Sequence, residues 1–212
     1  MPQPPACNLG ILVSGRGSNM LAIIRAIERK QIKGAKVTVV ISDRRDAKAL
    51  EIAERHGLHT VWLDPAESST RLHYDDRLME VLLENEVDSK KGLVLLAGFM
   101  RLLSPGFVEA FAGRVMNIHP ALLPSFPGLR AQEQAIRYGV KVSGCTVHFV
   151  VPEVDSGPII LQREVKVEEG DTPESLSERI LRQEHIAYPR AVKLFVEGRL
   201  KIEGRRVVIS KK

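Results

Sequence analysis

Short apolar runs alternate with helical patterns along the first half of the chain, and this alternation restricts the fold more than any other feature. Residues 9–13 form a continuous apolar run, which is typical of a strand buried on both faces. Residues 20–27 carry apolar side chains at helical spacing, and a second buried strand is predicted at 37–41. Because such alternation is typical of a parallel sheet covered by helices, we expect an α/β fold.

The same order continues to the middle of the chain and then becomes less regular. Further helices are predicted at 47–56, 72–85, 105–111 and 133–138, and further strands at 60–63, 93–97 and 115–118. Residues 143–151 and 159–167 are joined by a connection too short for a crossover helix, so these two strands should be antiparallel. We therefore expect a three-layer α/β/α, Rossmann-like, mostly parallel mixed sheet of about seven strands with helices on both faces.

The sequence from residue 171 onwards predicts one long helix followed by a tail. Asp171 and Thr172 precede Pro173, a pattern typical of a helix start. Pro189 should interrupt this helix, because proline has no amide hydrogen to donate. Residues 200–209 fit a terminal hairpin.

Length and composition indicate a broad class of protein. The chain has 212 residues, which suits a single domain, 1–212, with a flexible start at 1–8 and a tail at 203–212. No apolar segment approaches the roughly 20 residues that span a bilayer, and Cys7 and Cys145 lie in no metal-binding pattern. The net charge is +5, but the basic residues cluster only in isolated pairs, which argues against a nucleic-acid surface. We expect a cytoplasmic protein that acts on small molecules, without nucleic acid, membrane or metal. The sequence leaves the oligomeric state open, with a weak homodimer as one possibility.

Asn117 and His119 are the strongest candidates for chemistry. Two residues apart on a strand, they point to one face of the sheet, and Pro120 ends the strand directly after the histidine. Open parallel sheets bind ligands at the carboxyl ends of their strands. Taken alone, a histidine at a strand end is more often structural. The remaining histidines lack this context, and His148 fits a packing or surface position.

Asp155 lies in the constrained loop 152–158, between two prolines. If this loop folds over the end of the sheet, the carboxylate would bond to the imidazole of His119, raise its pKa and fix its tautomer. Together with Asn117, the group would suit stabilisation of an oxyanion and proton transfer to a leaving nitrogen. No serine or cysteine is placed as a nucleophile, so a second substrate would attack. An exposed aspartate without any such role is the plain alternative.

A glycine-containing loop, Ser-Gly-Arg-Gly-Ser-Asn at 14–19, connects the first strand to the first helix. The amides of Gly17, Ser18 and Asn19 can bind a phosphate at the helix start, and Ser18 and Asn19 can also cap the helix. Met20 stands where a dinucleotide-binding fingerprint has its third glycine, which argues against NAD. A structural turn is at least as common for this pattern.

Five ordered segments resemble the folate-dependent formyltransferases and cover nearly the whole chain. They are residues 14–19, 96–105, 117–124, 147–149 with 155–162, and 183–185. The resemblance implies transfer of the formyl group from 10-formyltetrahydrofolate, as a co-substrate, to the amino group of glycinamide ribonucleotide in purine biosynthesis. Two departures concern loop contacts: Ala121 replaces a serine usual in the family, and residues 130–132 lack the histidines of some relatives.

The resemblance also implies residue roles. Asn117 would hold the formyl oxygen, His119 would be the general acid, and Asp155 would keep that histidine protonated. The positions that match the ribonucleotide site are Gly17, Ser18, Asn19, Gly98, Met100, Pro120 and Glu184. The positions that match the folate site are Arg71, Met100, Arg101, Leu102, Leu103 and Asn117. Residues 120–132 would form a lid.

Simpler readings remain for some of these positions. Leu102 and Leu103 should be buried whatever the function, and Glu184 could be a surface charge on a helix. Other functions remain open as well. In a formyltetrahydrofolate hydrolase, water would replace the amine. In a nucleotide- or NAD-binding module, Asp43 would contact a ribose. A non-catalytic folate or nucleotide sensor is the third alternative.

Overall fold

The computed structural model of the protein describes residues 7–211. A flexible start was expected at 1–8, and residues 1–6 of this segment lie outside the described residues. Its last two residues, Cys7 and Asn8, belong to the first strand. The chain divides into two compact units, Met1–Met116 and Asn117–Lys212, and each is described by itself.

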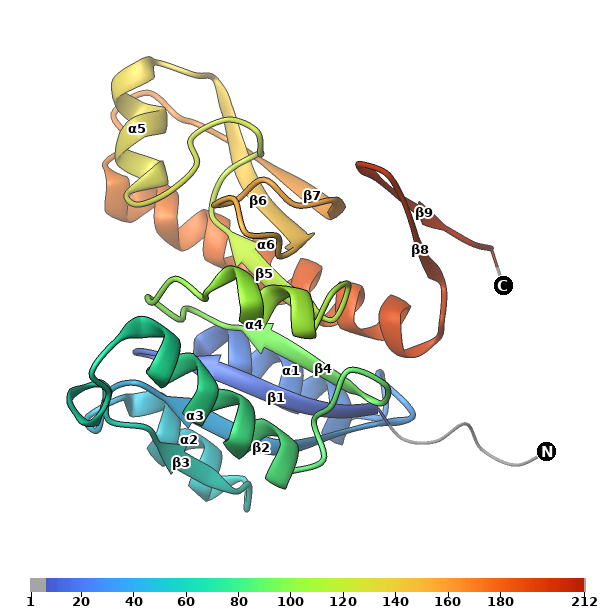
Figure 1. Ribbon diagram of the computed structural model, residues 1–212. Helices are drawn as coiled ribbons and strands as arrows, with labels where there is room; N and C mark the ends of the chain where they lie inside the picture. The colour runs from blue at the N-terminus through green and yellow to red at the C-terminus, as the bar shows by residue number, and fades with distance from the viewer. Residues whose placement is uncertain (1–6, 212) are drawn as a thin grey trace. The chain divides into compact units, whose positions relative to one another are not determined.

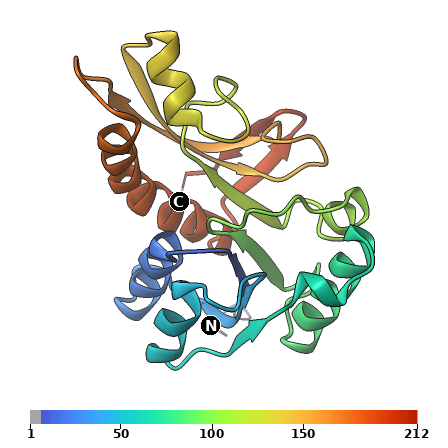
Figure 2. The same cartoon turned by 90° about the vertical axis from the view of Figure 1, so that its left-hand side faces the viewer.

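The first unit alternates strands and helices as expected. Its elements are β1 (Cys7–Val13), α1 (Ser18–Glu28), β2 (Ala35–Ser42), α2 (Lys48–Arg55), β3 (Thr60–Trp62), a 3-10 turn (Pro65–Glu67), α3 (Arg71–Glu84), β4 (Gly92–Leu96) and α4 (Pro105–Ala110). β1 pairs in parallel with β2 and β4, and β2 with β3, so the order is β3-β2-β1-β4. Figures 1 and 2 show α1 and α2 on one face of these strands and α3 and α4 on the other. This confirms the layered, parallel α/β arrangement.

Burial explains the continuous apolar runs of β1 and β4. β4 is buried at every position, and β1 is buried from Asn8 onwards. Both strands have helices on each side, so neither face is available to polar residues. Removal of their apolar side chains from water stabilises the folded state by about 25 cal/mol for each Å² of apolar surface buried. Continuous apolar runs are therefore what these two strands require.

The second unit combines an antiparallel pair with a long helix. β5 (Val115–His119) leads into it, and its elements are α5 (Ala131–Tyr138), β6 (Val142–Phe149), β7 (Ile159–Lys166), α6 (Pro173–Val196), β8 (Leu200–Glu203) and β9 (Arg206–Ile209). β6 and β7 are antiparallel, with a register shift between Val147 and His148. α6 packs along β6 and β7. The described residues contain nine strands, because the tail forms the hairpin β8–β9 in addition to the seven expected.

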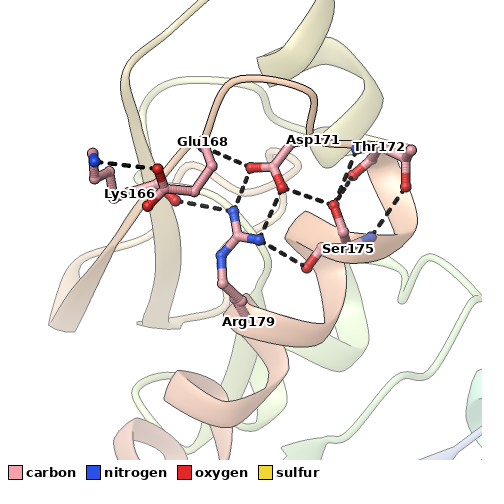
Figure 3. Close-up of polar contacts among 6 residues, drawn as sticks. All are labelled: Lys166, Glu168, Asp171, Thr172, Ser175 and Arg179. Carbon is pink, nitrogen blue, oxygen red and sulfur yellow. Dashed lines mark hydrogen bonds and ion pairs between the residues drawn. The ribbon is translucent and has the colours of Figure 1, made fainter.

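A polar network fixes the start of α6 (Figure 3). The Thr172 hydroxyl caps the helix by accepting a hydrogen bond from the amide of Ser175. The Ser175 hydroxyl accepts one from the amide of Thr172, which completes a capping box. The carboxylate of Asp171 accepts hydrogen bonds from Arg179 and Ser175, and the Arg179 guanidinium holds the pKa of Asp171 far below its usual range. The expected helix start is thus confirmed.

The expected interruption of this helix at Pro189 is wrong. α6 runs without a break from Pro173 to Val196, with the proline inside it. The missing amide costs about 3 kcal/mol in a helix interior. Tyr188, Ala191 and Val192 flank the proline and are fully buried, so packing of this segment offsets the cost. Within residues 7–211, no helix is both long and apolar enough to cross a membrane.

Candidate active site

The exit from β5 is held in place by two polar side chains of the antiparallel pair. β5 ends at His119, as Pro120 predicts. The Thr146 hydroxyl accepts from the amide of Leu123 at 3.0 Å and donates to the carbonyl of Ala121 at 2.7 Å. The amide of Gln162 donates to the carbonyl of Leu123 at 2.9 Å. The chain directly after His119 is therefore anchored to β6 and β7.

The structure brings Asp155 to His119, a contact that the sequence suggested only as a hypothesis. Nδ1 of His119 lies 3.2 Å from Oδ2 of Asp155, and the two side chains are only 5% and 9% exposed. On the other side of the ring, Nε2 lies 2.8 Å from the carbonyl oxygen of Phe126. A carboxylate and a carbonyl oxygen can only accept, so both contacts are satisfied together only when both ring nitrogens carry a proton. The geometry favours an imidazolium at His119.

Burial opposes this charge. It lowers the pKa of His119 below its ordinary value, and the rise produced by Asp155 and by the Phe126 carbonyl is smaller. The predicted influence of Asp155 is present, but it does not set the net direction. For Asp155, burial raises the pKa, yet contacts with His148 and Gly128 and the charge of His119 outweigh it, and the pKa is lowered. Asp155 thus stays ionised beside a histidine that releases its proton readily.

His148 belongs to the same cluster, which corrects its expected assignment to packing or the surface. It is 2% exposed, and its Nε2 lies 3.4 Å from Nδ2 of Asn117 and 3.6 Å from Oδ1 of Asp155. Its Nδ1 donates to the carbonyl of Phe149 at 2.9 Å. The alternation of side chains along β6 predicts on which face of the sheet His148 lies, but it does not predict which strand lies beside β6. The sequence therefore carried no signal for this contact.

The loop that carries Asp155 is pinned to the end of β6. The amide of Phe149 donates to the carbonyl of Pro158 at 3.0 Å. Asp155 adopts a left-handed conformation with φ of 51°, and its Oδ2 also accepts from the amide of Gly128 at 2.8 Å. A Cβ atom at Gly157 would lie 1.7 Å from the carbonyl oxygen of Phe149. Only glycine fits at position 157 without displacing the loop.

We expect Gly157→Ala to displace this loop and to lower both stability and activity. The added methyl overlaps backbone, which cannot rotate away, so the free energy of unfolding should fall by about 1–3 kcal/mol. Thermal unfolding and kcat measure the two effects. Gly106→Ala is the matched control, because a Cβ there meets nothing within 4 Å. Unchanged stability and rate in Gly157→Ala would show that the loop adapts at no cost.

In the first unit, the glycine loop takes a conformation that differs from the expected cap. α1 begins at Ser18 with Gly17 as its N-cap, so Ser18 and Asn19 lie inside the helix and the prediction that they occupy the cap is wrong. Gly17 has φ of 73°, and a Cβ there would lie 2.7 Å from the Cβ of Ala49. The close approach of α2 explains this glycine. The start of a helix is a position where backbone amides can bind an anion.

Two hydrogen bonds join the glycine loop to residues 98–100, another segment assigned to the ribonucleotide. The amide of Ser14 donates to the carbonyl of Gly98 at 3.1 Å. The hydroxyl of Ser14 accepts from the amide of Met100 at 2.9 Å. The structure thus brings together two of the segments that the resemblance assigns to one substrate.

The positions assigned to folate differ in exposure. Leu103 is 9% exposed, but Leu102 is 58% and Met100 67% exposed, so the expectation that Leu102 is buried is wrong. The guanidinium of Arg101 lies 4.6 Å from the ring centre of Tyr74. Arg71 is the first residue of α3 and is exposed. Side chains exposed in this way can contact a ligand without rearrangement of the core.

Glu184 is not a surface charge, although it lies on a helix. It is 6% exposed, on the buried face of α6. The pKa of the Cys145 thiol is raised to about 12, by burial and then by the charge of Glu184, which places the carboxylate near the middle of β6. A buried carboxylate is rare without a specific partner or ligand. Among residues 7–211, no three histidine, cysteine or acidic side chains are grouped to hold a metal ion.

Comparison with known sequences identifies the family. Residues 7–192 match the formyl transferase family. The chain is 44% identical over 196 residues to phosphoribosylglycinamide formyltransferase of Escherichia coli, covering 92% of this chain and 90% of that protein. It is 43% identical over 194 residues to the human trifunctional purine biosynthetic protein adenosine-3, covering 92% of this chain but only 19% of that protein.

Solved structures agree. Glycinamide ribonucleotide transformylase 1 from Symbiobacterium toebii superimposes with a TM-score of 0.94 at 52% identity, covering 99% of this chain and 96% of that one. A formyltetrahydrofolate deformylase from Pseudomonas syringae shares the fold with a TM-score of 0.87 at 24% identity, covering 97% of this chain and 66% of that one. The chain therefore belongs to the formyl transferase family and is a formyltransferase.

Proposed function

We propose that this enzyme transfers the formyl group of 10-formyltetrahydrofolate to the amino group of glycinamide ribonucleotide, a step of purine biosynthesis. The observation that carries the proposal is the buried His119, held between the ionised Asp155 and a single carbonyl oxygen. This arrangement suits a general acid that acts once per turnover. The names of the relatives support the ribonucleotide as the acceptor of the formyl group. Such a reaction needs small molecules only and suits a cytoplasmic enzyme.

The proposed reaction divides the work between Asn117 and His119. The substrate amine attacks the formyl carbon, and a carbon–nitrogen bond forms while the formyl oxygen becomes an oxyanion. Asn117 donates an amide hydrogen to that oxygen. The bond to N10 of the folate then breaks as Nε2 of His119 gives its proton to that nitrogen. The attacking nitrogen loses a proton to solvent, and His119 takes one up for the next turnover.

Phe126 gives the loop 120–132 a role in this scheme. Asp155 occupies Nδ1 of His119, so Nε2 is the nitrogen available to donate, and in the structure the Phe126 carbonyl occupies it. Phe126 has φ of 56°, a conformation that is rare outside glycine. The folate nitrogen would replace this carbonyl, and the loop would move when substrate binds. Residues 120–132 are therefore a lid that closes on His119.

We assign the ribonucleotide to the glycine loop, through the amides of Gly17, Ser18 and Asn19, and to the neighbouring Gly98 and Met100. By the family resemblance, Pro120 would also contact the ribonucleotide, and Glu184 would accept hydrogen bonds from its ribose hydroxyls. The folate would contact Arg71 and the segment from Met100 to Leu103. The link between residues 14–19 and 98–100 supports the first assignment.

A steady-state assay tests the proposal. The enzyme is supplied with 10-formyltetrahydrofolate, and release of tetrahydrofolate is followed with and without glycinamide ribonucleotide. We expect turnover only when the ribonucleotide is present. Release of tetrahydrofolate at the same rate in its absence would instead support a formyltetrahydrofolate hydrolase.

We expect Glu184→Gln to raise the KM for the ribonucleotide and to leave the KM for the folate nearly unchanged. The amide keeps the size of the side chain but replaces a charged acceptor, and each lost charge-assisted hydrogen bond costs roughly 1.5–3 kcal/mol, which is about a tenfold or larger rise. Glu178→Gln, an exposed position on the same helix, is the matched control. A larger rise in the folate KM would contradict the assignment.

A further inference from the structure

Two polar neighbours of His148, Asn117 and Asp155, take part in the proposed reaction, whereas His148 itself has no role in it so far. Its ring is 2% exposed, and each ring nitrogen faces a different kind of group. Nδ1 faces the carbonyl of Phe149 at 2.9 Å, and Nε2 faces Nδ2 of Asn117 at 3.4 Å. We propose that His148 is a positioning residue that fixes the amide of Asn117, so that one of its N–H groups points at the formyl oxygen. The inference rests on the proposed function.

The contacts of the ring set its tautomer. A carbonyl oxygen only accepts, so Nδ1 of His148 carries the hydrogen and donates it to Phe149. In a neutral ring, Nε2 is then an acceptor. The Asn117 nitrogen is within hydrogen-bond distance of that acceptor, whereas Oδ1 of Asp155, at 3.6 Å, lies beyond it. His148 therefore accepts one hydrogen from Asn117.

Other groups already engage Asp155 in this position. Its Oδ2 faces Nδ1 of His119 and the amide of Gly128. Its Oδ1 lies 3.6 Å from Nε2 of His148, farther than the nitrogen of Asn117 at 3.4 Å. Asn117 is therefore the nearer partner of Nε2.

The hydrogen bond to His148 selects one of two orientations of the Asn117 amide. Oxygen and nitrogen of this group have nearly the same size, so packing alone does not distinguish them. When Nε2 of His148 accepts one hydrogen, the nitrogen must face the ring, and its second hydrogen remains for the formyl oxygen. Loss of the acceptor lets the amide turn, and the oxyanion then loses its donor for part of the time.

Two substitutions of His148 separate its two contacts. His148→Gln places an amide near the position of Nε2, and its oxygen can accept from Asn117. His148→Asn places an amide near the position of Nδ1, which can donate to Phe149 but does not reach Asn117. We expect His148→Gln to keep kcat within about threefold, and His148→Asn to lower it roughly tenfold to a hundredfold, with both KM values unchanged; full loss of such a donor costs about 10²–10³.

A double-mutant cycle and an NMR measurement complete the test. In an Asn117→Ala background, His148→Asn should cause no further loss of kcat, since no amide remains to be positioned. In the free enzyme, the side-chain amide resonances that vanish in Asn117→Ala should shift in His148→Asn and not in the control His59→Asn, an exposed histidine. The NMR result needs no substrate, so it decides the contact even if the wild-type enzyme transfers no formyl group.

Three results would overturn the inference. The first is equal kcat in His148→Asn and His148→Gln. The second is a loss caused by His148→Asn that persists in the Asn117→Ala background. The third is a ¹⁵N signature of a doubly protonated His148 at neutral pH, because that ring would face the oxygen of the Asn117 amide instead.

Discussion

His119→Ala is expected to lower kcat by about 10²–10⁴-fold, the range typical of a lost general acid. The expected magnitude is large because Nε2 of His119 is the proposed proton donor to the leaving nitrogen, and alanine offers no replacement. The dissociation constant for the ribonucleotide should change by less than about twofold, since its assigned contacts lie elsewhere. Rapid-quench kinetics measure the first quantity, and calorimetry the second.

His59→Ala is the matched control for this substitution, because His59 is an exposed histidine without an assigned role. It should retain the wild-type rate. A His119→Ala enzyme with wild-type kcat would remove His119 from the chemistry. A parallel loss of ribonucleotide binding would indicate a structural role instead.

Asp155→Asn is expected to lower kcat by about 10²-fold or more and to move its pH dependence. In the wild-type enzyme the carboxylate raises the pKa of His119 against the larger lowering by burial. The amide removes the charge, so the pKa of His119 falls further. Because a general acid works only while protonated, activity is lost as pH rises through this pKa. The alkaline limb of the kcat profile should therefore move to lower pH in Asp155→Asn.

Profiles of kcat against pH for the wild-type, Asp155→Asn and Asp76→Asn enzymes test this prediction, with Asp76 as an exposed aspartate of α3. The control should keep the wild-type profile. An unchanged limb in Asp155→Asn would mean that Asp155 does not act on the charge of His119. A limb moved to higher pH would contradict the proposed electrostatics.

The sequence predicted those parts of the fold that follow from local pattern. The continuous apolar runs of β1 and β4 predicted buried parallel strands, and Pro120 predicted the end of β5 at His119. These are properties of single segments. Pro189 was misleading because burial of its neighbours, which is a tertiary effect, outweighs the local cost of the proline.

The site was predictable only in part, for the same reason. Asn117 and His119 share a strand, so alternation alone places them on one face. The contact with Asp155 was a hypothesis, because it depends on how the loop 152–158 folds back over β6. His148 was missed, since its partners lie on another strand and in that loop. Contacts between segments distant in the chain have no periodic signature.

The fate of the formyl carbon in a single turnover distinguishes transfer to the ribonucleotide from hydrolysis. The enzyme, in excess over 10-formyltetrahydrofolate labelled in its formyl carbon, is mixed with glycinamide ribonucleotide, and the products are separated. We expect the label to appear in the formylated ribonucleotide at the rate at which tetrahydrofolate is released. Label recovered as formate, with the ribonucleotide unchanged, would contradict it.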